Sequence, residues 1–202
     1  MKNAFIHSSE KYVNQIEHIF QLMDEAYQKA ADVYKFVCNG CKDNCCETRF
    51  FHHTHIECIY LIEGFKQLSE QQKTSIIENA TNVVERTKIL LESEEPVRLL
   101  CPLNENGRCL IYHYRPMICR LHGIAHELQI PGQQLQYTPG CEAFIAHCNA
   151  MKIENYYSLD RTPHYIRMAQ LEQAYKKEYN INQRFKATIP EMLMMYGQSL
   201  AK

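Results

Sequence analysis

Apolar residues recur at the period of an α-helix along the first part of the chain. Between about residues 9 and 36 they fall every three or four positions, at Ile16, Ile19, Phe20, Met23, Tyr27, Ala30 and Tyr34. This spacing puts them on one face, so we predict a long amphipathic helix. Ser8 or Ser9 can cap its first turn, because a serine oxygen accepts from the free amides there. Asn39-Gly40 is expected to end it.

Two more helical patterns follow. Thr54 is expected to cap a helix whose apolar face carries Cys58, Leu61, Ile62, Phe65 and Leu68. Ser69 is expected to cap the next one, with a core stripe of Ile76, Ala80, Val83, Val84 and Leu91. Pro96 marks its end, because the residue before a proline is disfavoured in the helical conformation. These three helices are predicted to form an antiparallel bundle.

The segment 97–150 has a different character. It holds four of the prolines, at 102, 116, 131 and 139, and only short apolar runs, so we expect it to build little core. A bound metal would supply the missing stability by coupling its binding to folding. Around Pro131-Gly132 the stretches HELQI and QLQYT predict a short hairpin.

The C-terminal part is again helical in pattern. Thr162-Pro163 suits a helix start, because proline is tolerated in the first turn. Met168, Leu171, Tyr175 and Tyr179 then line one face, and a last short helix is expected after Ile189-Pro190. The predicted fold is mainly α: a helical bundle with a cysteine-rich irregular segment folded around metal. We expect one metal-binding domain, 1–202, with cysteine-rich loops at about 38–46 and 97–150 and C-terminal helices within 160–200.

Composition narrows the possible partners. The net charge is −1, which gives no basic field for nucleic acid or for an anionic membrane. No run of about 18 apolar residues is present, so no transmembrane helix is expected. The N-terminus does not resemble a signal peptide, so a cytoplasmic location is expected. Thiols stay reduced there, and the ten cysteines therefore call for an explanation other than disulfides.

Eight cysteines form the candidate metal ligands. They are Cys38, Cys41, Cys45 and Cys46 in the stretch CNGCKDNCC, followed by Cys101, Cys109, Cys119 and Cys141. Two residues between Cys38 and Cys41 let both sulfurs face one ion. The side chains of the adjacent Cys45 and Cys46 tend to diverge, so either one is not a ligand or the two serve different metals. The set supplies two four-thiolate sites, or one site plus a reactive remainder.

The spaced segments resemble the YkgJ-like cysteine-cluster family of zinc- or iron-chelating domains. The matching residues are Cys38, Cys41, Cys45 and Cys46, then Cys101-Pro102, Cys109-Leu110-Ile111-Tyr112, Arg115-Pro116 and Cys119-Arg120. The resemblance spans 38–120, or reaches Cys141 if TPGC is included, and it implies that these cysteines bind metal. It implies no defined reaction. The signature also looks like that of the flagellin lysine methylases, where it implies an iron–sulfur cluster, although this chain is short for such an enzyme.

Several other residues have two interpretations each. Cys58 is expected to be a buried thiol, and Cys148 is either a ligand or a core residue. His122 and His126 would share a face if they lay on a helix, and so would offer a metal site, but Gly123 between them disfavours a helix. His52, His53 and His55 are either ligands or residues of a solvated loop and cap.

Two arginines and two tyrosines flank the later cysteines. Arg115 and Arg120 either favour the thiolates and offset the charge of a four-thiolate zinc site, or form surface salt bridges. Tyr112 and Tyr114 either cover the site or belong to the core.

The residues leave three functions open. The first is a zinc- or iron-binding protein, with an iron–sulfur cluster as one form of the site, in a structural, storage, delivery or redox role. The second is a metalloenzyme for redox or group transfer such as methyl transfer, so whether the chain is an enzyme is open. The third is an interaction module held in shape by metal. Zinc is slightly favoured in an aerobically purified sample, because clusters are often lost in air.

Overall fold

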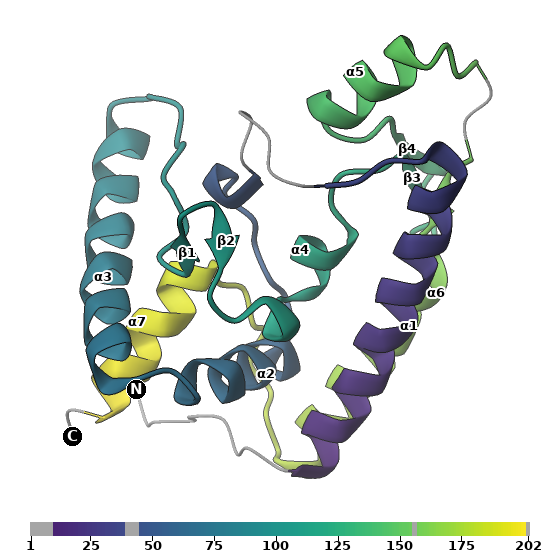
Figure 1. Cartoon of the computed structure of the whole chain (residues 1–202). Helices are drawn as coiled ribbons and strands as arrows, with labels where there is room; N and C mark the ends of the chain where they lie inside the picture. Colours follow the sequence, from purple (N-terminus) through teal and green to yellow (C-terminus); the bar gives the residue numbers. More distant parts are fainter. Residues whose placement is uncertain (1–9, 39–44, 155–156, 201–202) are drawn as a thin grey trace.

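Two pairs of helices frame the molecule (Figure 1). The computed structural model of the protein describes residues 10–38, 45–154 and 157–200. One pair is α1 (Glu10–Tyr34) with α6 (Thr162–Glu178), and the other is α3 (Glu70–Glu92) with α7 (Ile189–Leu200). Between them lies α2 (His55–Lys66), which contacts α1, α6 and α7. The fold is thus mainly helical, as predicted.

The starts of the helices follow from local capping. The Thr54 side chain accepts from the Glu57 amide at the start of α2, and Ser69 forms a capping box with Gln72 at the start of α3. Pro163 lies in the first turn of α6. Each of these starts was predicted, and so were the buried faces of α1, α2 and α6. The last predicted helix is also present, as α7.

The end of α3 differs from its prediction. The helix stops at Glu92, and Glu94 takes a left-handed φ of 58°, so the chain turns before it reaches Pro96. Leu91 was predicted to be core, but it is 48% exposed. The apolar stripe of α3 therefore ends with Val84, because the last turns of the helix extend past their neighbours.

The predicted bundle of the first three helices is wrong. The main neighbour of α3 is α7. The two helices pack closely where Gly197 of α7 lies beside Ile77 of α3. The apolar face of α1 is covered instead by α6, α2 and a short helix α4 (Met117–Leu121). Helices from the C-terminal end of the chain thus take the places that the prediction gave to sequence neighbours.

Helix α2 belongs to both hydrophobic cores. Ile56, Ile59 and Tyr60 pack into the core around α1 and α6. Cys58, Leu61, Ile62 and Phe65 pack into the core around α3 and α7, so Cys58 is the buried thiol that was expected. Because α2 is buried on both sides, it supplies apolar side chains to both cores and so connects the α1–α6 pair of helices to the α3–α7 pair.

The 97–150 segment contains short elements that the hydrophobic periodicity of the sequence does not predict. Two small strands, β1 (Asn104–Glu105) and β2 (Arg108–Cys109), pair antiparallel. The predicted hairpin is confirmed as β3 (His126–Leu128) with β4 (Gln136–Thr138), and β3 also pairs in parallel with β5 (Leu159–Asp160). The rest of the segment contains α4, α5 (Glu142–Ala150) and a 3-10 turn, η2 (Tyr112–Tyr114). Another 3-10 turn, η1 (Cys45–Glu47), lies earlier in the chain, before α2.

This segment also adds to the cores, contrary to expectation. Its buried hydrophobic side chains are Leu103, Ile111, Leu121, Ile124, Ala125, Phe144 and Cys148. Phe144 makes edge-to-face contacts with the rings of Tyr34 and Phe36 at the C-terminal end of α1. None of the helices in the described residues is long and apolar enough to cross a membrane.

Replacing Gly64 with alanine is expected to destabilise the protein. In an exposed helix this change adds about 1 kcal/mol of stability. Here a Cβ at Gly64 would stand 2.3 Å from Cγ of Tyr114, whose ring packs against Tyr60. Overpacking of this kind costs about 1–3 kcal/mol, so urea denaturation should show a net loss. Ser75→Ala on the exposed side of α3 is the control, and a raised midpoint for Gly64→Ala would contradict the prediction.

Candidate metal centre

Four cysteines from separate segments interact electrostatically with one another. They are Cys46 in η1, Cys101 before β1, Cys109 in β2 and Cys119 in α4, and we call them the Cys46 group. Each of the four thiols interacts electrostatically with the other three. The Cys101 amide also donates to the Cys46 carbonyl at 2.9 Å, which joins the two cysteine-bearing parts of the chain.

A tight turn sets the position of two of these cysteines. Asn106 and Gly107 both take positive φ, 52° and 82°, which is the conformation that an Asn-Gly hairpin turn requires. The turn folds β2 back on β1, so that Cys109 pairs with Asn104, whose amide donates to the Cys101 carbonyl at 2.9 Å. This hairpin was not predicted, although the Asn-Gly dipeptide was the signal for it.

Burial makes the thiolate forms of this group costly without a cation. It raises the pKa of Cys101 and Cys109, and it raises the pKa of Cys119 to about 12. A bound metal cation reverses this preference, because it binds the thiolate and not the thiol.

Arg115 brings positive charge to the same place. Its guanidinium interacts electrostatically with Cys46, Cys109 and Cys119. It is held there by hydrogen bonds to the carbonyls of Tyr112, at 2.9 Å, and Cys119, at 3.2 Å, and it stacks 3.5 Å from the centre of the Tyr112 ring. Arg115 therefore fits the first of its two predicted roles. Tyr112 covers this arginine, whereas Tyr114 packs in the core against Gly64.

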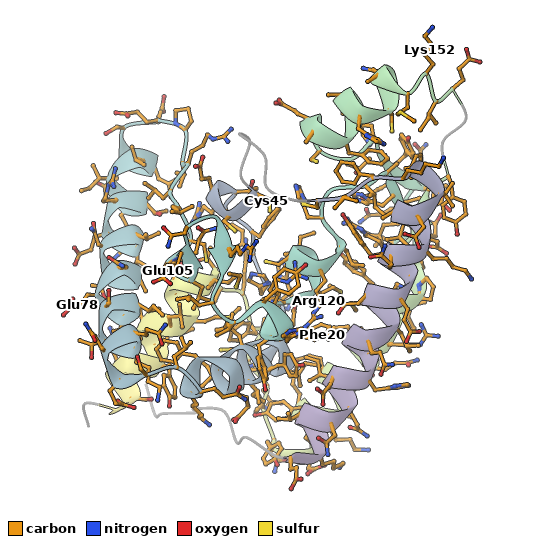
Figure 2. The ribbon with its side chains drawn as sticks, in the orientation of Figure 1. Phe20, Cys45, Glu78, Glu105, Arg120 and Lys152 are labelled. Carbon is orange, nitrogen blue, oxygen red and sulfur yellow. The ribbon has the colours of Figure 1, made fainter. Side chains whose placement is uncertain are left out.

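Arg120 takes a different part. It is buried beside Phe20, as Figure 2 shows, and donates to Asp24 and to the carbonyls of Arg115 and His113. Neither of its two predicted roles fits, because it is buried and its hydrogen bonds go to α1 and to the backbone. It ties the cysteine-bearing loop to α1.

Cys45 and Cys46 contact each other, and the prediction that their side chains diverge is wrong. The Cys45 thiol shares a hydrogen bond with the Cys46 sulfur, which raises the pKa of Cys45 and lowers that of Cys46 to about 6. Asn104 and Arg115 assist the lowering. The 3-10 turn η1 brings the two sulfurs together, because it curls the chain more tightly than an extended loop does. Cys45 also interacts with Cys119 and with Cys38.

The remaining predicted ligands lie to one side of this group. Cys38 is exposed, and Cys141 stands at the start of α5, where its amide donates to the Gly123 carbonyl at 2.8 Å. Both thiols interact electrostatically with Tyr27, whose pKa is raised first by burial and then by these neighbours. Cys41 lies outside the described residues.

The histidine site considered at His122 and His126 does not form. Helix α4 ends at Leu121, Gly123 turns the chain with a φ of 120°, and His126 lies in β3. The two histidines therefore share no helical face. Burial lowers the pKa of His126 to about 4, and its Nδ1 lies 3.1 Å from the Ile124 carbonyl.

Burial also decides the roles of Cys148 and of the three histidines near Thr54. Cys148 has no exposed surface and packs in the core around α1, so it is a core residue. His52 and His55 are buried next to Glu57 and Glu172 and are not solvated, whereas His53 is exposed.

The donor set of the Cys46 group fits zinc or iron in its chemistry: four thiolates with one compensating guanidinium. Within 10–38, 45–154 and 157–200, however, no group of three or more His, Cys, Asp or Glu side chains stands in an arrangement that could hold an ion. None of the described cysteines is in a disulfide. Comparisons of the chain with protein-family models, with curated proteins and with solved structures found no match.

Proposed function

We propose that this protein binds zinc or iron through the Cys46 group. The observation that carries the proposal is that four thiols from distant segments interact electrostatically with one another, and three of them with Arg115. A four-thiolate Zn²⁺ site has a net charge of −2, and Arg115 offsets part of it. Binding draws the thiols together and so is coupled to folding of the loops that carry them.

A structural role for this ion is favoured over storage or delivery. Its ligands come from η1, the β1–β2 hairpin and α4, and the ion would join all three. Among the described residues, a backbone hydrogen bond from the Cys101 amide to the Cys46 carbonyl links η1 to the segment that leads into the hairpin. An ion bound by Cys46 on one side and by Cys101 and Cys109 on the other would strengthen this link between η1 and the hairpin. A redox role needs an iron–sulfur cluster in the same place.

The other candidate ligands form a second set that adjoins this group at Cys45. Cys38 and Cys141 interact electrostatically with Tyr27, and Cys45 interacts with Cys38 as well as with Cys46 and Cys119. The spacing of Cys41 from Cys38 favours the same set. We infer a second thiolate site there, with Cys46 serving the first site and Cys45 the second. The adjacent cysteines would then bind different ions, which was one of the two possibilities open from the sequence.

The resemblance to the YkgJ-like cysteine-cluster proteins supports the same proposal. The segments that carry it, from Cys101-Pro102 through Arg115-Pro116 to Cys119-Arg120, are those that supply the Cys46 group and its arginine. A metalloenzyme is the second candidate, and one observation favours it. Helix α4 carries Cys119 on the metal side, while its Met117 and Ile118 line a separate pocket.

Anaerobic purification followed by elemental analysis and a visible spectrum of the same sample tests the proposal. We expect zinc or iron at roughly one ion per four thiolates, or iron with sulfide and a visible absorption band if a cluster is bound. Cys109→Ser should lose the ion of the first site, while Cys38→Ser should keep it. Cys58→Ser, which changes a buried thiol outside both sets, is the matched control. Metal-free wild-type protein, or full metal in Cys109→Ser, would rule the proposal out.

A further inference from the structure

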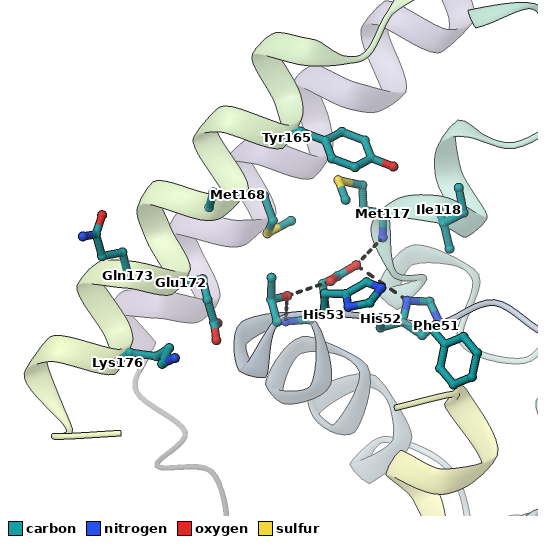
Figure 3. Close-up of a pocket in the computed structure, with 13 residues that line it drawn as sticks. Phe51, His52, His53, Met117, Ile118, Tyr165, Met168, Glu172, Gln173 and Lys176 are labelled. Carbon is teal, nitrogen blue, oxygen red and sulfur yellow. Dashed lines mark hydrogen bonds and ion pairs between the residues drawn. The ribbon is translucent and has the colours of Figure 1, made fainter. Parts of the chain in front are cut away.

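A pocket of about 680 Å³ opens between the start of α2, helix α4 and one face of α6 (Figure 3). Its volume is in the range of pockets that hold small organic molecules. It rests on different residues from the Cys46 group, and nothing in the cysteine pattern accounts for it. Its polar groups come from the start of α2 and from α6, and its apolar walls from α4 and α6.

The key polar group is Glu57, a carboxylate that is only 2% exposed. It accepts hydrogen bonds from the Thr54 hydroxyl at 2.7 Å and from the Met117 amide at 3.0 Å, both of which are neutral donors. Burial opposes its charge, but the attraction of His52 and these hydrogen bonds together hold the pKa of Glu57 below its ordinary value. A buried carboxylate is costly to desolvate, so a cation hydrogen-bonded to Glu57 would stabilise it.

His52 lies next to it and is also unsatisfied. Its side chain is 2% exposed, and neither ring nitrogen has a hydrogen-bond partner. Nδ1 stands 3.7 Å from Oε1 of Glu57, beyond hydrogen-bond distance. With a proton on the nitrogen that faces Glu57, Nε2 is left as a free acceptor. Leaving such a group buried without a partner is costly, and a bound donor would remove that cost.

The second carboxylate of the pocket is already satisfied. Glu172 lies 2.6 Å from Nδ1 of His55 and accepts from the Ile56 amide at 3.3 Å. Figure 3 shows Lys176 near Glu172, at the end away from His52. Glu57, whose ion-pair partner His52 stands beyond hydrogen-bond distance, is therefore the carboxylate that can still accept from a cationic donor.

The walls around these acceptors are apolar. Met117 comes from α4, Met168 and Tyr165 come from α6, and Ala169 stands at the exposed edge. Thioethers and an aromatic face suit an alkyl chain that ends in a cation. A carboxylate ligand would be repelled by Glu57, and an alcohol would offer it only a neutral donor.

We propose that this pocket binds a small protonated alkylamine, whose ammonium donates to Glu57 and His52 and whose alkyl part lies against Met117 and Met168. The site is independent of the proposed metal, but it lies close to it. Glu57 interacts electrostatically with Cys119, so the amine and the Cys46 group would share α4.

Isothermal titration calorimetry of the full chain with a series of primary amines, from methylamine to hexylamine, tests the proposal. At least one member is expected to bind at millimolar concentration or better. The alcohol of equal length should bind at least about tenfold more weakly, since a hydrogen bond to a charged group contributes about 1.5–3 kcal/mol. The carboxylate of equal length should give no binding heat. No binding by any amine, or equal binding of the alcohol, would overturn the proposal.

Two variants locate the site. Ala169→Trp fills the edge of the pocket from an exposed position, and it is expected to weaken amine binding at least about tenfold. Gln170→Trp is the matched control, because its neighbouring exposed position does not line the pocket. Glu57→Gln should weaken binding to a similar extent. If that variant does not fold, the comparison of Ala169→Trp with Gln170→Trp tests the location of the site. Equal affinity in Ala169→Trp and Gln170→Trp would place the amine elsewhere.

Discussion

Replacing Cys119 with serine is expected to release the ion of the Cys46 group and to unfold much of the 97–150 segment. A structural zinc site contributes on the order of 10–16 kcal/mol of apparent binding energy to folding. A whole domain is stable by only about 5–15 kcal/mol. The segment also has apolar residues in both cores, which keep part of it in place. We therefore expect a loss of more than about 3 kcal/mol, short of the full binding energy.

Urea denaturation of metal-loaded protein, followed by circular dichroism, measures this loss. Cys148→Ser is the matched control: it lies in the same segment and is fully buried, but it is outside both cysteine sets. It should cost about 1–3 kcal/mol for burying a hydroxyl and should retain all the metal. Adding a chelator should bring wild type close to Cys119→Ser and leave Cys119→Ser unchanged. Wild-type metal content and stability in Cys119→Ser would contradict both this prediction and the proposed structural role.

The starts of helices were predictable from the sequence because they depend on a few adjacent residues. Thr54, Ser69 and Thr162-Pro163 each begin the helix that was assigned to them. The pairing of helices was not predictable in the same way. Whether α3 packs on α1 or on α7 depends on residues more than a hundred positions away, such as Gly197 beside Ile77.

The 97–150 segment shows why periodicity underestimates a core. Leu103, Ile111 and Ile124 are buried, but they stand singly in turns and bends between short elements. A period of 3.6 or 2 cannot appear in elements of two to five residues. The buried side chains there are positioned by their contacts with α1 and α2, which the local sequence does not contain.

The eight candidate ligands came from the sequence, but their grouping did not. The sequence predicted that Cys45 and Cys46 diverge, whereas in the fold Cys46 interacts with Cys45 and also with Cys101, Cys109 and Cys119. The amine pocket was missed altogether. Its one sequence signal is Glu57, an acid between the apolar residues Ile56 and Cys58 of α2.

Arg120 connects the cysteine-bearing loop to α1, and its loss should have the second large effect. The side chain is 5% exposed, and its guanidinium lies 4.3 Å from the centre of the Phe20 ring. It donates to the Arg115 carbonyl at 2.8 Å, to the His113 carbonyl and to Asp24 at 2.5 Å. The two carbonyls belong to the loop that carries Arg115 towards the Cys46 group.

Arg120→Met is expected to lower the free energy of unfolding by about 2–4 kcal/mol, because two backbone carbonyls lose their donor. Asp24→Asn should cost less than about 1 kcal/mol, since the Asp24 side chain is 48% exposed and water can replace the arginine. Urea denaturation of both variants measures the difference, and equal losses would show that the ion pair, not the carbonyl bonds, is what matters. Metal analysis of the same samples adds a second readout. If Arg120 holds the loop in place for binding, Arg120→Met should also bind zinc more weakly, while Asp24→Asn should bind it as wild type does.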